Sequence, residues 1–187
     1  MLQRMRRRYD TDLYAGRVRK VKELMPHACI GVDVITGTPG ENEEEFLKTH
    51  EFLRSVPVDH LHVFTYSERA NTTAIRMEDV VPMEVRRDRT RQLRILSSKM
   101  HRAHYQRHLG TMRPVLFEKG DGILSDTMED YTDKYIRVTL PYDPALVDRI
   151  VSVELQRIDG DGHVLSAVRR HSRSQAGPMD HHHGAPA

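Results

Sequence analysis

GVDVITGTPGE, residues 31–41, decides the fold of the first half of this 187-residue chain. The segment begins as a β-branched, almost wholly apolar run, which is typical of a strand buried on both faces. A turn with Gly37 and Gly40 follows, and Asn42 with Glu45 three residues later predicts the capped start of a helix. Such a strand–turn–helix unit gathers backbone N–H groups at one point, where an anionic ligand can bind. A tight turn without a ligand is the alternative, because neither the P-loop nor the dinucleotide-binding pattern is present.

The segments around this turn alternate between helix and strand. Apolar residues at helical spacing predict a helix over residues 11–25, capped by Asp10 or Thr11. Residues 28–35 are predicted as the buried strand, followed by a helix over 42–55 and a second buried strand over 60–66. Short connections between alternating helices and strands indicate crossover helices and parallel strands. The predicted fold class of this half is therefore α/β.

A long basic helix is predicted over residues 83–108, directly after Pro82. Its inner stripe consists of Val85, Leu93, Leu96 and Met100. We assign eight basic side chains to its outer face: Arg86, Arg87, Arg89, Arg91, Arg94, Lys99, Arg102 and Arg107. Only Glu84 and Asp88 oppose them, so a contact with an anionic partner and a plain solvated surface both remain open.

The pattern changes after Gly110, where short strands replace helices. We predict strands over residues 112–118, 122–125, 132–140, 149–157 and 163–168, separated by turn signals such as KGDG and DGDG. Several short strands without helices between them indicate a small β-barrel. The predicted domains are residues 1–109, residues 110–169, and a disordered tail over 170–187 whose His181–His183 run is not expected to be a metal site.

The composition excludes several classes of protein. The formal net charge is +2, the pI is about 8.7 and 38% of residues are hydrophobic, which is polar but within the range of folded proteins. No apolar run approaches the roughly 18 residues of a membrane span, and the basic start lacks the apolar core of a secretory signal. The single cysteine, Cys29, excludes a disulfide framework, so we expect a cytoplasmic protein.

Two further segments carry candidate functional residues. HVFTYSERANTTA, residues 62–74, leaves the second strand at the same sheet edge as the glycine turn, and its Arg69 could bind a carboxylate through two N–H groups. LQRMRRRYD, residues 2–10, holds four arginines that could face phosphate. Taken alone, each is equally compatible with an exposed basic surface.

Taken together, the three segments resemble the radical-SAM methylthiotransferases that modify tRNA. DVITGTPGENEEEF (33–46), YSERANTTA (66–74) and LQRMRRRYD (2–10) are similar to three motifs of that family in the same order. The resemblance covers roughly residues 1–168 and is greatest, through LHVFTYS (61–67), to the branch acting on threonylcarbamoyladenosine at tRNA position 37; the isopentenyladenosine branch comes second. Asn71 replaces a glycine of the family pattern, and Thr38 replaces an aromatic residue.

This resemblance implies a fold, cofactors and binding residues. The fold is the C-terminal half of a TIM-like radical-SAM barrel followed by a small, OB-like TRAM barrel that holds RNA. The cofactors of a complete enzyme are S-adenosyl-L-methionine and two [4Fe–4S] clusters, and the partner is the tRNA anticodon loop. The implied cofactor-binding residues are Asp33, Thr36, Gly37, Glu41 and Arg69, and the implied substrate-binding residues are Arg7 and Tyr66.

Iron is the main departure from the family. Cluster irons need cysteine thiolates, and this chain offers only Cys29, which we expect to be a small apolar residue in a strand. No residue is singled out as an acid, base, nucleophile or metal ligand. We therefore expect a fragment of the enzyme that is inactive alone.

The β module is expected to hold the RNA. Its candidate contacts are Lys119, Lys134, Tyr135 and Arg137, with Tyr135 and Arg137 on one face of a strand, where an aromatic ring and a guanidinium suit base stacking and phosphate contact. Two other functions remain open: a non-catalytic RNA-binding protein, and an unrelated α/β enzyme that binds a phosphate ligand at the glycine turn.

Overall fold

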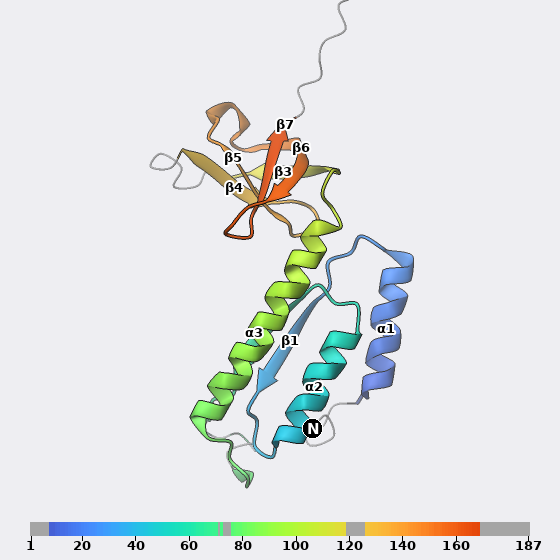
Figure 1. The fold of residues 1–187 in the computed structure, drawn as a ribbon, viewed down its shortest axis with the longest axis vertical. Helices are drawn as coiled ribbons and strands as arrows, with labels where there is room; N and C mark the ends of the chain where they lie inside the picture. Colours follow the sequence, from blue (N-terminus) through green and yellow to red (C-terminus); the bar gives the residue numbers. More distant parts are fainter. Residues whose placement is uncertain (1–7, 71, 73–75, 119–125, 169–187) are drawn as a thin grey trace, which may run out of the picture.

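The computed structural model describes residues 8–70, 72, 76–118 and 126–168. The predictions for Arg7, Asn71, Lys119, the strand over 122–125 and the tail with His181–His183 lie outside these residues. Figure 1 shows an α/β unit and a five-stranded sheet joined by one long helix. No helix of the described residues is long and apolar enough to cross a bilayer.

The first unit follows the predicted alternation of helix and strand. Its elements are α1 (Thr11–Leu24), β1 (Gly31–Thr36), α2 (Glu43–Ser55), β2 (His60–Thr65) and α3 (Met83–Gln106). The Asp10 carboxylate accepts a hydrogen bond from the Leu13 N–H at the start of α1, and Asn42 does the same for Glu45 at the start of α2. β1 and β2 pair in parallel from Gly31↔His60 to Thr36↔Thr65, which confirms the parallel arrangement.

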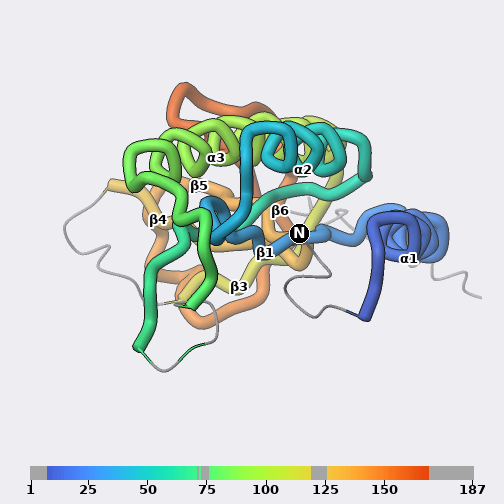
Figure 2. Tube along the Cα trace, turned by 90° about the horizontal axis from the view of Figure 1, so that it is seen from below, coloured from blue at the N-terminus to red at the C-terminus, as the bar shows by residue number. Residues whose placement is uncertain are grey.

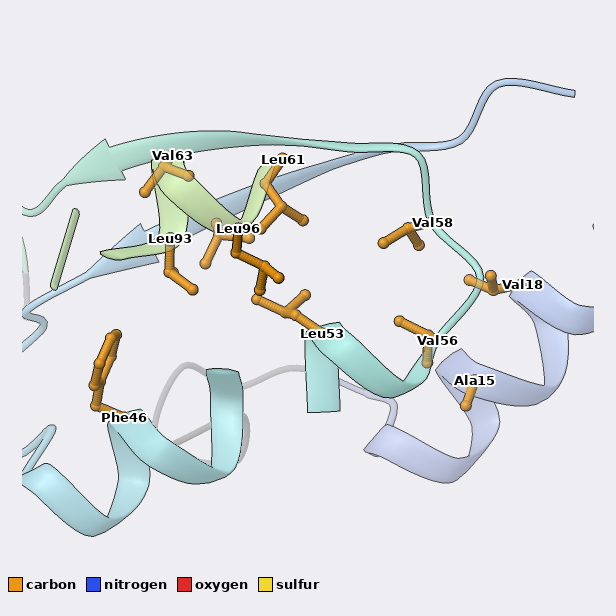
Figure 3. Packing of buried hydrophobic residues seen from close by; sticks show 11 residues of the cluster. Ala15, Val18, Phe46, Leu53, Val56, Val58, Leu61, Val63, Leu93 and Leu96 are labelled. Atoms are coloured by element: carbon orange, nitrogen blue, oxygen red, sulfur yellow. The ribbon is translucent and has the colours of Figure 1, made fainter. Parts of the chain in front are cut away.

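The helices cover one face of these two strands. Figure 2 shows α2 and α3 along the same side of β1, and Figure 3 shows Leu61 and Val63 of β2 packing toward Leu93 and Leu96 of α3. On the other face, Ile35 and Phe64 are 45% and 54% exposed. The prediction of strands buried on both faces is therefore wrong for the described chain, because helices pack on one side only.

The second unit is a curled antiparallel sheet with one parallel pair. It contains β3 (Met112–Phe117), β4 (Thr127–Tyr131), β5 (Arg137–Pro141), the 3-10 turn η2 (Pro144–Leu146), β6 (Arg149–Ile158) and β7 (Val164–Val168). The strand order is β3-β6-β7-β5-β4, and an isolated bridge between Val115 and Thr132 brings the two edges together. Its core is a separate apolar cluster that includes Phe117, Ile136 and Leu155.

The predicted strand over 132–140 is corrected by this sheet. A turn occupies its first half, where the Thr132 hydroxyl accepts hydrogen bonds from the Lys134 and Ile136 N–H groups. Tyr135 has a positive φ of 56°, which no strand residue adopts. Regular pairing begins only at Arg137, and β4, which the sequence did not predict, precedes the turn.

The helix α3 connects the two units directly. Leu93 and Leu96 belong to the first core, whereas Tyr105 belongs to the second. Beyond its end, the Gly110 N–H donates to the Leu155 carbonyl at 2.7 Å. The change from helix to strand falls between residues 106 and 112.

Candidate functional site

The two strands of the first unit end at the same edge, where four of the predicted site residues lie. The Tyr66 N–H donates to the Thr36 carbonyl at 2.9 Å, so the segments after β1 and β2 start side by side. Thr36, Gly37, Glu41 and Tyr66 all lie at this carboxyl edge. Asp33 is exposed on the uncovered face of β1, opposite His62 of β2.

The glycine turn is held by hydrogen bonds among its own residues. Gly37 and Gly40 have φ angles of 74° and 82°, a conformation that glycine adopts without strain. The buried Glu41 carboxylate accepts the Gly37 N–H, and burial raises the pKa of this carboxyl above its ordinary value. The Gly37 N–H that an anionic ligand could use is thus held by an internal carboxylate.

Arg86 lies directly beneath this turn rather than on the outer face of α3. It is 3% exposed, and a Cβ on Gly37 would lie 2.3 Å from its Cγ, so the glycine makes room for the arginine. Its guanidinium donates to the Val81 carbonyl at 2.7 Å and the Tyr66 carbonyl at 3.1 Å. It also pairs with Glu68 at 2.6 Å, so Arg86 ties the end of β2 to α3.

Arg89 is the second arginine that the sequence assigned wrongly to the outer face. It is 4% exposed and donates to the Glu41 carbonyl at 2.7 Å and to the Glu43 carboxylate at 3.1 Å. Arg86 and Arg89 precede the buried Leu93 by seven and four residues, which places them on the inner stripe of α3. Buried arginines are tolerated there because carbonyls and carboxylates accept their N–H groups.

Two predicted residues retain free polar groups. The hydroxyl of Tyr66 is enclosed and has no hydrogen-bond partner among the described residues, while the Arg86 guanidinium lies 5.3 Å from the centre of its ring. Arg69 is exposed in the loop after β2, and its backbone carbonyl accepts the Thr72 hydroxyl, while its guanidinium has no partner among the residues that the structure describes. An enclosed donor without a partner is uncommon, and a ligand can satisfy it.

A buried ion-pair network at the opposite edge was missed by the sequence analysis. Asp59, 1% exposed, pairs with Lys22 at 2.6 Å and with Arg107, and accepts the Ile30 N–H at 2.7 Å. His104, which is fully buried, places Nδ1 3.2 Å from Asp59 Oδ1 and Nε2 2.9 Å from the Lys134 carbonyl of the β module. This network therefore spans α1, the start of β1, α3 and the β module.

The charges of this network are fixed by its geometry. Burial alone would raise the pKa of Asp59, but hydrogen bonds from His104, Lys22 and the Ile30 amide hold it well below its ordinary value. Burial alone would lower the pKa of His104, yet its contacts with Asp59, Cys29 and the Lys134 carbonyl raise it to about 9. Cys29 lies within 4.8 Å of both groups, outside any strand, but two cations already neutralise the carboxylate. The cluster is an ion-pair network rather than a cation site.

The predicted RNA-binding residues lie on the turn that α3 holds. Tyr135 is 67% exposed, and Tyr105 of α3 accepts the Arg137 N–H with its hydroxyl at 3.0 Å. Arg137 pairs with Glu129 at 2.5 Å, and Lys134 pairs with its neighbour Asp133 at 3.0 Å. The predicted strand alternation does not apply to Tyr135, since its ring projects from a turn.

Comparison with known proteins finds tRNA-modifying enzymes. The chain is 34% identical over 160 residues to the threonylcarbamoyladenosine tRNA methylthiotransferase of Bacillus subtilis, a match that covers 83% of this chain and 35% of the relative. It is 36% identical over 157 residues to the tRNA-2-methylthio-N(6)-dimethylallyladenosine synthase of Symbiobacterium thermophilum, covering 84% and 33%. The synthase of that name from Bacillus subtilis is 34% identical, covering 84% and 31%.

These matches have a defined extent. The chain spans about a third of the length of the curated relatives that it matches. No family model matches the chain. The two groups of relatives, which differ in the adenosine named, are similar to this chain at nearly equal identity.

Proposed function

Because this chain belongs to the radical-SAM tRNA methylthiotransferase family, we propose that it forms the tRNA-facing part of such an enzyme. In this proposal the α/β unit is the carboxyl half of a TIM-like barrel, and the β module is a TRAM-like RNA-binding domain. The reaction is methylthiolation of threonylcarbamoyladenosine at position 37, in the anticodon loop of a tRNA in the cytoplasm. The observation that carries this proposal is the 34% identity, over 83% of this chain, to the threonylcarbamoyladenosine tRNA methylthiotransferase of Bacillus subtilis.

The carboxyl edge of β1 and β2 is the proposed site for S-adenosyl-L-methionine, which supplies the methyl group and the adenosyl radical in this family. The enclosed Tyr66 hydroxyl fits a polar ligand at this edge, because nothing in the described chain satisfies it. We propose that Asp33, Tyr66 and Arg69 face the ligand. Thr36, Gly37 and Glu41 do not contact the ligand in this proposal. Their polar groups already form hydrogen bonds within the protein and fix the shape of the turn.

An iron–sulfur cluster does not fit the residues of this chain. A [4Fe–4S] cluster needs several thiolates, and the sequence holds one cysteine. Cys29 lies before β1, at the opposite end of the strand from the glycine turn, and its Sγ is 3.7 Å from Nδ1 of His60. The chemistry that a cluster performs in this family is therefore not assigned to any residue here.

The β module supplies the proposed RNA contact. The exposed Tyr135 ring offers a stacking surface for an unpaired base, and Lys134 and Arg137 beside it offer positive charge. Both cations are already paired with carboxylates, so we expect phosphate to compete with Asp133 and Glu129. Binding should therefore weaken steeply with salt.

Deleting the gene and measuring tRNA nucleosides by mass spectrometry tests this function. We expect 2-methylthio-threonylcarbamoyladenosine to disappear and its unmethylthiolated precursor to accumulate. Selective loss of the 2-methylthio-isopentenyladenosine product instead would assign the chain to the second branch, whose relatives match it nearly as well. Unchanged levels of both nucleosides would refute the proposal and favour a non-catalytic RNA-binding protein.

A further inference from the structure

A pocket lies on the outer side of α3, beside the end of β2. Its volume is about 360 Å³, and its lining includes the side chains of Arg87, Arg91, Arg94 and Ser98 and the two threonines Thr65 and Thr90. Thr65 is the last residue of β2, so the pocket opens near the edge at which the glycine turn lies. It is large enough for a phosphate group with its attached sugar.

The pocket carries an excess of positive charge. Arg91 pairs with Asp88 at 2.5 Å, but neither Arg87 nor Arg94 forms an ion pair within the described chain. Three guanidiniums thus face one carboxylate. Arg86 and Arg89, by contrast, are buried and bonded to carboxylates, so they add no free charge to the pocket.

The floor of the pocket offers a hydroxyl donor. The Thr90 hydroxyl lies 2.8 Å from that of Thr36 and 2.7 Å from that of Thr65, which forms a chain of three hydroxyls. The Thr36 hydroxyl also donates to the Phe64 carbonyl at 3.5 Å. When it donates to Thr90 instead and Thr90 donates to Thr65, the Thr65 O–H is free to donate into the pocket. Guanidiniums with a hydroxyl donor are the groups that bind phosphate oxygens.

The pocket is aligned with the β module along one stripe of α3. Arg87, Arg94 and Tyr105 are seven and eleven residues apart, which are close to whole numbers of helical turns. Tyr105 holds the turn that carries Tyr135. Arg94 and Tyr105 are about 16 Å apart along the helix axis, at a rise of about 1.5 Å per residue.

We propose that this pocket binds a backbone phosphate of the RNA whose base-reading contacts lie on the β module, so that the RNA runs along α3. The inference rests on the proposed function for its ligand, but it adds a contact on the α/β unit. It also gives the arginines of α3 two separate roles. Arg86 and Arg89 hold the turns together, whereas Arg87 and Arg94 bind the phosphate.

The test measures tRNA binding to the whole chain at several salt concentrations. Arg87→Gln and Arg94→Gln remove one pocket charge each. Arg19→Gln is the matched control, because Arg19 is an exposed arginine of α1 with no ion pair in the described structure. Losing one phosphate contact should reduce the slope of log K against log salt by about 0.8. That slope corresponds to about sixfold weaker binding at 0.1 M salt, whereas Arg19→Gln should leave the slope unchanged.

The outcomes separate this inference from the proposed function. If the wild type binds tRNA and both pocket variants behave like Arg19→Gln, the pocket assignment is wrong while RNA binding stands. If the wild type does not bind tRNA at low salt, both proposals fail. Adenosine monophosphate serves as a second probe. If it binds the chain, displaces tRNA and no longer binds Arg94→Gln, the pocket is a site for a free nucleotide and the RNA assignment is wrong.

Discussion

Raising the pH from 6.5 to 9 should remove about 3 kcal/mol of stability from this protein through one residue, His104. Its two ring nitrogens face the Asp59 carboxylate at 3.2 Å and the Lys134 carbonyl at 2.9 Å. Both partners accept hydrogen bonds and so favour a proton on each nitrogen, whereas the Arg107 guanidinium, 3.3 Å from Nδ1, can only donate. The negative charge of Asp59 and the Lys134 carbonyl make the imidazolium the favoured form of His104 in the fold.

The magnitude follows from the pKa of His104, which rises from its ordinary 6.5 to about 9. Each tenfold change in proton affinity is worth about 1.4 kcal/mol, which gives about 3 kcal/mol. Because the folded pKa is the higher one, this stability is complete below pH 6.5 and is lost as the pH rises through about 9. The pKa of Asp59 is lowered from 3.8, so its side of the same interaction is lost only under more acidic conditions.

Urea unfolding followed by circular dichroism at pH 6.5 to 9.5 measures this loss. Two neutral variants test the two hydrogen bonds of His104 one at a time. His104→Asn keeps an N–H donor near the Asp59 carboxylate, and His104→Gln keeps an N–H donor that reaches the Lys134 carbonyl. Both should be less stable than the wild type at pH 6.5 and nearly independent of pH over this range. The charged groups Lys22 and Arg107 and the Cys29 thiol, all near the ring, remain in every variant.

A wild-type stability that stays constant within about 0.5 kcal/mol over this range would refute the reasoning. So would a decline of the same size in His104→Asn and His104→Gln. The half-buried His101 and the buried His108 do not imitate the effect. Burial lowers the pKa of each from 6.5, so their contribution to stability does not fall as the pH rises.

Gly37→Ala should destabilise the fold by about 2–4 kcal/mol, because its methyl group would meet a buried arginine and the backbone has a positive φ. Gly16→Ala on α1, where nothing lies nearby, should instead stabilise the fold by about 0.5–1 kcal/mol. Equal effects of the two substitutions in urea unfolding would contradict this reasoning. Phe64→Ser should change the stability in urea unfolding by no more than about 0.5 kcal/mol, because the Phe64 ring is 54% exposed on the uncovered strand face; a loss above about 2 kcal/mol would contradict this. Tyr105→Phe should speed hydrogen exchange of the Arg137 amide about tenfold by removing its acceptor, while amides of the α/β unit keep their rates.

The order of helices and strands could be predicted because local chemistry specifies it. Asp10 and Asn42 cap the helices that the sequence assigns to them. The β-branched segments form the parallel pair. The turn around Tyr135 was predicted as a strand, although Thr132 with Asp133 is a turn signal, because the apolar and polar residues after it alternate.

The arginines of α3 show where charge misled the prediction. Spacing from Leu93 would place Arg86 and Arg89 on the inner stripe, but their charge led to their assignment to the outer face. Their burial depends on acceptors from distant segments, such as Glu41 and Glu68. The Asp59–His104 pair was out of reach for the same reason, because it joins residues 45 positions apart.

The helix α3 makes the two apolar cores share one backbone. Leu93 and Leu96 fill the first core and Tyr105 fills the second, without a linker between them. Melting either core would unwind turns that the other core needs for its own packing. The molecule should therefore lose both in a single cooperative transition, and the two halves should not come apart as independent folding units.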